Sequence, residues 1–417
     1  MPSALPKIAI IGAGPGGTCL ARILHLNNIP CTIYEIDADP SARSQGGSLD
    51  LHPKMGQAAL RKAQLWSEFT AHARYEGEEM VIASRDGVAV IHLKDQETDR
   101  PEIDRGDLRR ILLESLPEGT IKWNHHLRKV EAGTLHFADG TTESGFDLIV
   151  GADGAWSKVR PLLTTVNPFY SGITMVEIKL RDMDTKHPEL SAFLGDGSYF
   201  ALGEEEERAL LCQRQSDRSV RVYCTDWRPE HWLRDNGIDF KNPEDVRTRL
   251  LDEYKSWDSR LQDLIRYCDD DMAGRPLYML PPGLRWSSKR GVTVLGDAAH
   301  LATPFAGMGV NAALTDAMIL AESIIAEYNS SGDMDKAIKE YEKKMHPLAN
   351  KVTTETWTNL LMRFQEGGIA HMQERVNRGL EELEKEKRRK GEGSEEVEQK
   401  KKEVVMRVAE TAKVDGN

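Results

Sequence analysis

The chain has few cysteines, and they show no pairing pattern. Five are spread over 417 residues without C-x-x-C spacing: Cys19, Cys31, Cys212, Cys224 and Cys268. A scattered, odd-numbered set is not typical of a disulfide framework or a zinc site, and it favours reduced thiols in the cytoplasm. The histidines show no helical ligand spacing beside carboxylates, so we expect no metal centre.

An excess of positive charge and long apolar runs are also missing. The net charge is −12 and the pI is about 5.6, so no broad positive field would attract nucleic acid or an anionic membrane. No stretch approaches the ~18 apolar residues of a membrane span, and Ile8–Ile11 is too short for a signal segment. We therefore expect a soluble, cytoplasmic protein that binds neither nucleic acid nor a membrane, and we expect it to be a monomer.

Short buried strands alternate with helices near the N-terminus. Lys7–Ile11 predicts a strand, Pro15–Asn27 a helix and Cys31–Glu35 a second strand. Further along we expect a helix over Arg105–Leu116, then a pair of strands around Thr134–Phe137 and Gly145–Val150. This order is typical of an α/β fold with a Rossmann-like domain.

The chain then changes character. Apolar and polar residues alternate, as in Ser219–Cys224, which predicts antiparallel strands with one wet face. Val292–Leu295 returns to a buried strand, and helices are expected over Gly309–Tyr328 and Met334–Phe364. We therefore divide the chain into a Rossmann-like domain (1–166 and 286–330), an inserted, mainly antiparallel sheet domain (167–285), a C-terminal helix (331–375) and a charged tail, helical or disordered (376–417).

A glycine motif follows the first strand directly. Gly12-Ala13-Gly14-Pro15-Gly16-Gly17 fits G-x-G-x-x-G. Gly12 permits a tight turn, Gly14 lets a pyrophosphate approach the backbone, and Gly17 lets helix and strand pack closely. Glu35, at the end of the second strand, can accept hydrogen bonds from both hydroxyls of an adenosine ribose. The motif predicts a dinucleotide site and leaves FAD and NAD open.

Two further motifs follow later strands. The first runs from Asp153 to Arg160 as D-G-x-x-S-x-V-R, and the second is Gly296–His300, followed by P-x-x-G-x-G-x-N over Pro304–Asn311. With these motifs the sequence resembles the class A flavoprotein aromatic hydroxylases of the para-hydroxybenzoate hydroxylase type, which carry all three in the same order. The resemblance implies bound FAD, a GR2-type FAD-binding domain, and cofactor contacts at Asp153, Asp297, Gly307 and Gly309.

The chemistry of these residues agrees with that cofactor. Asp297, at a strand end, can accept hydrogen bonds from ribityl hydroxyls. Gly307 and Gly309 let the backbone pass close to the isoalloxazine ring. The helix that begins there directs N–H groups and a positive dipole end at the pyrimidine edge, which would stabilise an anionic reduced flavin.

A further stretch narrows the resemblance. Arg43–His52, Gly56–Leu60 and Ile103–Arg109 are similar to the flavin-dependent tetracycline-inactivating monooxygenases. That likeness implies that Asp50 and Arg105 contact FAD, and that Arg43 lies where NADPH is contacted. Arg105 suits this role because a guanidinium is a permanent cation beside an anionic cofactor.

The likeness fades in the sheet domain, which selects the substrate in those enzymes. Where they place a tetracycline-facing histidine on a strand, the aligned residue here is Arg221. Gln213, Tyr223 and Phe200 are expected to line the same site. This departure argues against tetracycline as the natural substrate, and no catalytic acid or base can be carried over.

The resemblance implies a monooxygenase. NADPH or NADH would reduce the flavin, O₂ would form a C4a-hydroperoxide, and one oxygen would pass to a small, largely apolar aromatic or polyketide-like molecule. A halogenase of this fold would carry a W-x-W-x-I-P signature, which the sequence lacks. A flavin-dependent oxidoreductase or dehydrogenase without oxygen transfer, and a non-catalytic flavin-binding protein, stay open as alternatives.

Overall fold

The computed structural model describes residues 5–42, 46–94 and 99–390, and the chain forms two compact units. Unit 1 contains the described residues up to Ala73, then Glu102–Ser171 and Tyr278–Asn359. Unit 2 contains Arg74–Pro101, Gly172–Leu277 and the described residues from Leu360 onward. Each unit is therefore assembled from three separate stretches. The stretches 74–101 and 360–390 lie outside the sheet domain expected over 167–285.

Unit 1 is built on a five-stranded parallel sheet in the order β17-β11-β1-β2-β7. Its strands are β1 (Ile8–Ile11), β2 (Cys31–Tyr34), β7 (Ile121–Lys122), β11 (Leu148–Gly151) and β17 (Val292–Val294). β1, β11 and β17 are short, apolar and buried throughout, as strands of parallel sheets are. The predicted Rossmann-like order of strand, glycine turn, helix and strand is confirmed.

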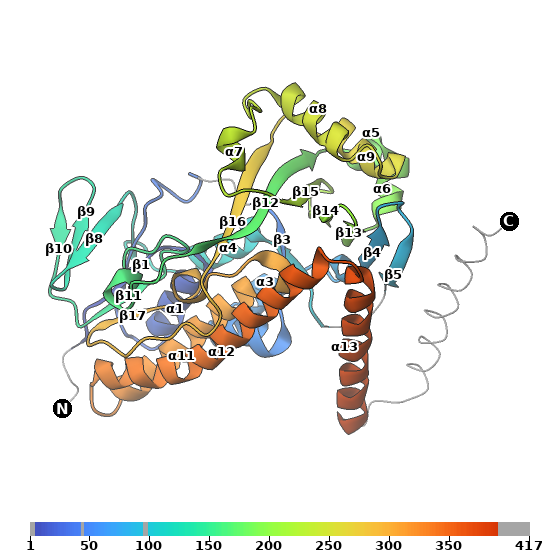
Figure 1. Ribbon diagram of the computed structural model, residues 1–417. Helices are drawn as coiled ribbons and strands as arrows, with labels where there is room; N and C mark the ends of the chain where they lie inside the picture. The colour runs from blue at the N-terminus through green and yellow to red at the C-terminus, as the bar shows by residue number, and fades with distance from the viewer. Residues whose placement is uncertain (1–4, 43–45, 95–98, 391–417) are drawn as a thin grey trace. The chain divides into compact units, whose positions relative to one another are not determined.

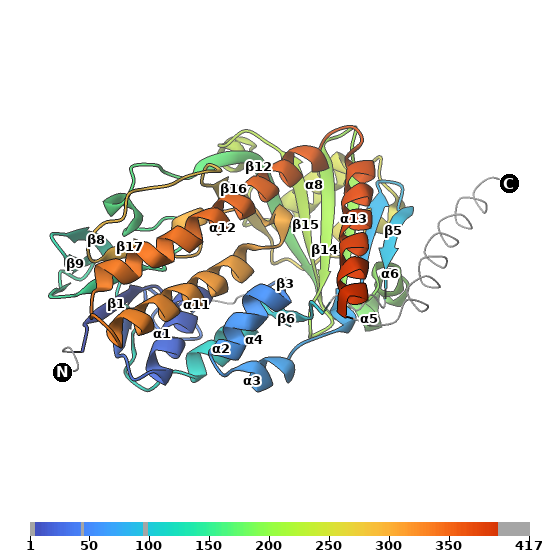
Figure 2. The ribbon, with the colours of Figure 1, turned by 90° about the horizontal axis from the view of Figure 1, so that it is seen from below.

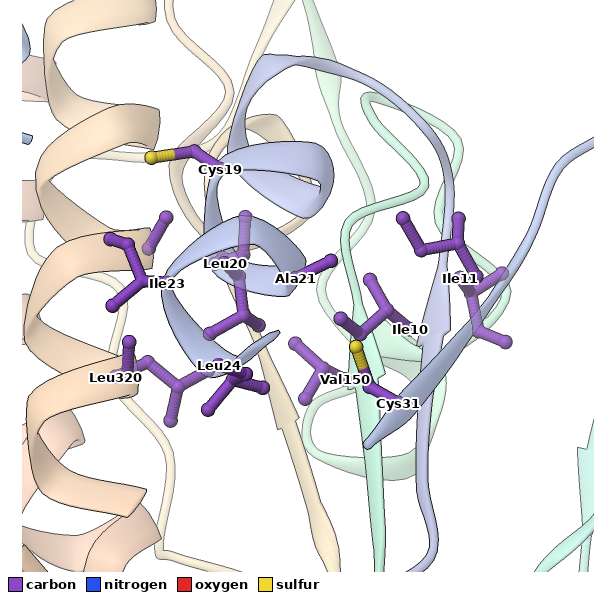
Figure 3. Packing of buried hydrophobic residues seen from close by; sticks show 14 of the residues in the cluster. Ile10, Ile11, Cys19, Leu20, Ala21, Ile23, Leu24, Cys31, Val150 and Leu320 are labelled. Carbon is purple, nitrogen blue, oxygen red and sulfur yellow. The ribbon is translucent and has the colours of Figure 1, made fainter. Parts of the chain in front are cut away.

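Helix α1 (Pro15–Leu26) connects β1 to β2. Pro15 in its first turn favours a helix start, and Leu20, Ile23 and Leu24 are fully buried. Burying each of these side chains stabilises the fold by about 1.5–3 kcal/mol. Figure 3 shows α1 packed between the strands β1 and β11 and the helix α11 (Gly309–Tyr328). This layered core holds the motif turns in place.

Shorter elements surround this core: β3 (Ser48–Asp50), η1 (Pro53–Gln57), α2 (Ala58–Lys62), α3 (Trp66–Thr70), β6 (Glu102–Asp104), α4 (Arg105–Glu114), β8 (Leu127–Glu131), β9 (Thr134–Phe137), β10 (Thr142–Glu143), η3 (Arg160–Leu162), α10 (Asp297–His300) and η4 (Pro304–Ala306). β3 pairs with β6, and β8, β9 and β10 form a separate small sheet (Figure 1). The expected pairing of Thr134–Phe137 with Gly145–Val150 is wrong. β9 alternates between buried and half-buried residues, whereas β11 is buried throughout and joins the parallel sheet.

Two long helices complete unit 1. α11 and α12 (Met334–Arg363, in unit 1 as far as Asn359) run side by side in Figures 1 and 2. By length and composition alone α11 could cross a membrane, which was not expected from the sequence. In this fold its buried residues include Asn311 and Asp316, and it packs against α1, so α11 serves as a core helix.

Unit 2 is built on a seven-stranded sheet in the order β16-β12-β15-β14-β13-β4-β5. Its strands are β4 (Met80–Ser84), β5 (Ala89–Leu93), β12 (Phe169–Leu180), β13 (Ser198–Gly203), β14 (Arg208–Arg214), β15 (Val220–Trp227) and β16 (Ala273–Met279). β12 with β15, β15 with β14, β14 with β13 and β4 with β5 pair antiparallel, and β13 with β4 pairs parallel. The predicted, mainly antiparallel sheet is confirmed.

Helices cover one face of this sheet. The unit contains η2 (Glu76–Glu78), α5 (Met183–Lys186), α6 (Pro188–Leu194), α7 (Trp232–Asp235), α8 (Pro243–Glu253), α9 (Ser259–Arg266) and α13 (Gly368–Lys390). Leu250 of α8 and Leu264 of α9 share a core with Val222 and Cys224 of β15. Because strand side chains alternate, Arg221 and Tyr223 belong to the opposite face.

The C-terminal segment forms two helices where one was expected over 331–375. α12 ends at Arg363, and α13 begins at Gly368. Between them Gly367 has φ +81°, a left-handed conformation that ends helices. α13 contacts β4 and β5 (Figure 2). The rest of the expected tail, residues 391–417, lies outside the described residues.

Candidate cofactor site

The sequence motifs meet at one edge of the parallel sheet. The register pairs Ile11 with both Tyr34 and Gly151, and Gly151 with Val294, so four strands end level with one another. Glu35 and the three motifs follow these strand ends directly. Since the chain passes from β1 to β2 on one side and later returns to β11 on the other, this edge is the topological switch point at which α/β sheets bind ligands.

Gly12 and Gly17 are required by the protein's own packing. Gly12 has φ +106°, and a Cβ there would lie 2.4 Å from the backbone oxygen of Ala152. A Cβ on Gly17 would lie 2.2 Å from the backbone oxygen of Gly12, so α1 could not approach its turn. These contacts explain why both positions are glycine.

Gly14 and Gly309 differ from these two. Apart from the adjoining backbone, no described atom lies within 4 Å of a Cβ added at either residue. Gly14 caps α1 and Gly309 begins α11, so each adjoins backbone N–H groups without intrahelical partners and the positive end of a helix dipole. The two helix starts are neighbours, because a Cβ on Gly16 would lie 3.2 Å from the backbone oxygen of Ala313. Open space beside two helix N-termini fits a dinucleotide such as FAD.

Glu35 has a second role that was not expected from the motif. Its buried carboxylate accepts hydrogen bonds from the backbone N–H of Ala13 at 2.5 Å and of Asp37 at 3.0 Å. The residue that the sequence assigned to a ribose therefore also fixes the glycine turn.

Asp153 follows β11 with one oxygen already bonded. Its Oδ2 accepts a hydrogen bond from the backbone N–H of Lys158 at 2.7 Å, whereas its buried Oδ1 has no partner among the described residues. Burial raises the pKa of Asp153, against the hydrogen bonds from Ser157 and Lys158. A buried acceptor without a partner indicates a place where a further bound group is expected. Arg160 donates to the backbone oxygen of Ala298 at 3.3 Å and so links the second motif to the third.

The third motif presents Asp297 on a glycine turn. Gly296 has φ +59° and ψ −140°, a conformation that favours glycine. Asp297 is exposed to solvent, yet protein atoms surround it closely enough that burial raises its pKa. The charges of His300 and Arg105 act in the opposite direction and favour the ionised carboxylate. Arg105 and Asp297, far apart in the sequence, are therefore electrostatic neighbours.

A buried ion pair that was not predicted lies beside Asp297. His300 Nε2 is 2.6 Å from Asp316 Oδ2, and the two side chains are 3% and 0% exposed. Burial lowers the pKa of His300, but the Asp316 carboxylate, together with Asp297 and a backbone hydrogen bond, more than offsets this, so the pKa is raised above its usual value. The feature of the sequence that could have indicated this pair is Asp316, an acidic residue within the largely apolar segment Gly309–Tyr328.

This pair should make the stability of unit 1 depend on pH. A histidine whose pKa is raised by folding stabilises the fold fully below its unfolded pKa, and the contribution is lost as the pH rises through its folded pKa. We expect Asp316→Asn to remove most of this dependence. Melting temperatures of both proteins between about pH 6 and about pH 10 test this, because parallel profiles would contradict it.

Asn311, the last residue of the third motif, holds Asp50. It is fully buried, its Nδ2 donates to the backbone oxygen of Asp50 at 2.8 Å, and its Oδ1 accepts from the backbone N–H of His52 at 2.8 Å. The Asp50 carboxylate lies 2.9 Å from His52 Nε2. A Cβ on Gly307, which has φ +65°, would lie 3.7 Å from Asp50 Oδ1. The first turn of α11 thus places Asp50 beside the Gly307 turn.

The residues expected at the substrate lie on one face of the unit 2 sheet. The register pairs Gln213 with Arg221, and pairs Leu211 with both Phe200 and Tyr223. By strand alternation this is the face opposite α8 and α9. The structure therefore brings these four candidates together.

Arg221 is already engaged on that face. It forms an ion pair with Glu177 of β12, and the same carboxylate accepts a hydrogen bond from Arg275 Nε at 2.8 Å. Two guanidinium groups therefore share one carboxylate, which leaves the cluster with a net positive charge.

One predicted residue is not described, and one cavity is separate from the predicted site residues. Arg43, which the resemblance places at NADPH, is outside the described residues. A cavity of about 570 Å³ alongside α4 is lined by residues that include Ser41, Arg109 and Trp123. None of the described site residues predicted from the sequence lines this cavity.

Comparison with known proteins agrees with the motifs. Residues 6–356 match the family model described as FAD binding domain. The monooxygenase penA of Penicillium thymicola is 31% identical, covering 87% of this chain and 96% of penA. The 6-hydroxynicotinate 3-monooxygenase of Pseudomonas fluorescens is 26% identical, covering 87% of this chain and 93% of that enzyme.

The fold has relatives among solved structures. The tetracycline destructase Tet(51) shares 18% identity with a TM-score of 0.65, covering 91% of this chain and 97% of that one, a likeness that shows the fold alone. The expected resemblance to class A flavoprotein hydroxylases is confirmed by the family match and by monooxygenases among the relatives. This chain belongs to the FAD-binding-domain family, and it is an FAD-dependent monooxygenase.

Proposed function

We propose that the enzyme takes reducing equivalents from NADPH or NADH and transfers one oxygen atom of O₂ to a small, largely apolar aromatic or polyketide-like molecule. The observation that carries the proposal is the meeting of three motifs at one sheet edge in a chain whose relatives include monooxygenases. A relative that acts on 6-hydroxynicotinate supports an aromatic substrate. We further propose that the protein is a monomer that acts without nucleic acid or membrane. We also propose that it works in the cytoplasm, and the free cysteines of the chain support this location.

We assign FAD to the motif edge of unit 1. Bound FAD supplies hydride acceptance and oxygen activation, and the residues of the chain bind it, orient it and exclude water. Those proposed to hold it are Gly12, Gly14, Gly17, Glu35, Asp50, Arg105, Asp153, Asp297, Gly307 and Gly309, with Arg43 at the nicotinamide nucleotide. Gly14 at the start of α1 suits the diphosphate of FAD. Arg105 and the neighbouring carboxylate Asp297 suit the diphosphate and the ribityl chain.

We assign the substrate to the sheet of unit 2. Phe200 and Tyr223 offer aromatic surface, and Gln213 and Arg221 offer polar contacts on the same face. A largely apolar site with a few polar groups is typical of small-molecule binding. In this proposal the inserted domain selects the substrate, and the Rossmann-like domain holds the cofactor.

The test is a substrate screen with the purified holoenzyme. Consumption of NADPH and of NADH is measured with phenols, polyketides and tetracyclines, and products are analysed for a mass gain of one oxygen. We expect at least one compound to stimulate NAD(P)H consumption and to gain oxygen. Stoichiometric peroxide release with every compound would instead favour the oxidoreductase without oxygen transfer.

The substrate assignment has its own test in Tyr223→Ala. We expect KM for the substrate found in the screen to rise about tenfold, because an aromatic contact is lost. FAD content should stay unchanged. Arg181→Ala is the control, since Arg181 lies at the end of the sheet and pairs with Asp269 and Asp271. An unchanged KM in Tyr223→Ala contradicts the assignment.

A further inference from the structure

We propose that His300 and Asp316 are a positioning pair for the cofactor: together they fix the turn that presents Asp297 to FAD and hold a cation next to that carboxylate. The proposal rests on the assignment of Asp297 to FAD. It adds two residues that touch neither the cofactor nor the substrate in our assignment.

One carboxylate oxygen joins three parts of the site. Asp316 Oδ2 accepts a hydrogen bond from the backbone N–H of Gly296 at 2.9 Å and lies 2.6 Å from His300 Nε2. Gly296 is the residue just before Asp297, and Asp316 lies two turns after Gly309, where α11 begins. The two proposed flavin contacts Asp297 and Gly309 are therefore fixed relative to each other through a single buried group.

The charges around Asp297 alternate. His300 interacts with Asp297 on one side and with Asp316 on the other, and Arg105 is a second cation near Asp297. A neutral imidazole could keep one hydrogen bond to Asp316, but it would remove the positive charge from the neighbourhood of Asp297. The carboxylate would then be less well stabilised in the ionised form that accepts hydrogen bonds from hydroxyl groups.

Other titratable groups face the pair from α12. Tyr341 and His346 both interact electrostatically with Asp316, and Tyr341 donates a hydrogen bond to the backbone oxygen of Val294 at 2.9 Å. Glu342 acts on both of these residues. Any pH effect must therefore be shown to depend on His300 itself.

The experiment measures the FAD dissociation constant of the apoprotein as a function of pH. For the wild type we expect affinity to fall as the pH rises through the pKa of His300. In Asp316→Asn this fall should move to lower pH, with affinity at neutral pH at least about tenfold weaker, as is usual when an outer partner of a ligand-binding group is removed. In His300→Gln the pH dependence should disappear. The double variant should bind FAD about as well as whichever single variant binds it less tightly, because the two residues act as one unit.

Glu342→Gln is the matched control. Glu342 is a buried carboxylate that accepts hydrogen bonds from Trp286, Ser288 and Thr293, so its loss weakens the fold of the same unit. It should leave the pH profile of FAD binding unchanged. Wild-type affinity and pH profile in both His300→Gln and Asp316→Asn would overturn the proposal, as would an equal pH shift in Glu342→Gln.

The remaining outcomes are also decisive. If Asp316→Asn does not fold, the presence or absence of the pH dependence in His300→Gln decides the question alone. Failure of the underlying assignment is recognised separately, because Asp297→Ala would then keep its FAD.

Discussion

Asp297→Ala is expected to fold and to lose FAD. The substitution removes a carboxylate acceptor for the cofactor and a negative charge that interacts with Arg105 and His300. Hydrogen bonds to a charged group contribute about 1.5–3 kcal/mol each, so two of them correspond to roughly 100-fold or more in FAD affinity. The measurement is the visible flavin absorbance per protein after gel filtration. Full FAD occupancy in this variant would remove the third motif from the cofactor site.

The melting temperature of the apoprotein distinguishes a loss of FAD contacts from a loss of the fold. Asp297 is exposed to solvent and its pKa is raised, so replacing it opens no cavity and removes no stabilising charge from the apoprotein at neutral pH. The melting temperature of the Asp297→Ala apoprotein should therefore equal or exceed that of the wild-type apoprotein. Asp297→Asn, which keeps the shape and one acceptor oxygen, should retain more FAD than Asp297→Ala. A lower melting temperature in the alanine variant would mean that the loss of FAD has a structural cause.

Gly17→Ala should lower the stability of the fold, whereas Gly14→Ala should lower the affinity for FAD. At Gly17 the new methyl group would lie 2.2 Å from a backbone oxygen, which α1 can relieve only by moving away from β1. Overpacking of a buried contact destabilises by about 1–3 kcal/mol, and we expect at least the upper figure because the clash is with backbone. At Gly14 no described atom opposes the methyl group, so the apoprotein should fold normally.

The two variants are distinguished by urea unfolding of the apoproteins and by FAD titration. Gly17→Ala should unfold at clearly lower urea concentration. Gly14→Ala should keep the wild-type midpoint and bind FAD at least about tenfold more weakly, because its methyl group occupies the approach to the helix N-terminus. Equal FAD affinity in Gly14→Ala and wild type would place the diphosphate elsewhere.

The geometry of the motif edge could be predicted because its signals are local. Gly12, Gly17 and Glu35 stand within a short stretch, and strand, turn and helix follow there in an order that few folds share. The shared edge for Asp153 and Asp297 follows from a rule of topology, since both come directly after buried parallel strands. Chain order and residue type were enough to place these groups together.

The partners of these groups could not be predicted in the same way. Asp316 lies in a largely apolar helix, and only the fold shows that its carboxylate meets His300 and Gly296. The ion pair of Arg221 with Glu177 depends on a register between strands 44 residues apart. The pairing expected between Thr134–Phe137 and Gly145–Val150 is wrong for a related reason. β9 pairs with β8 and β10, whereas β11, which is close in sequence, joins the parallel sheet.

The interleaved build of the two units has a consequence for synthesis on the ribosome. Several strand pairs join residues that are far apart in the sequence. Ile8 pairs with Leu148, β11 pairs with Val292–Val294, and β4 pairs with β13. Such long-range pairing is slow and leaves strand edges unpaired in the meantime. The first glycine turn emerges early, yet the carboxylate Asp297 and the helix start at Gly309 follow only after the first two stretches of unit 2 have been translated. In the proposed assignment the cofactor site is complete only after Gly309 has been translated, so we expect excess FAD to favour folding only from that stage onward.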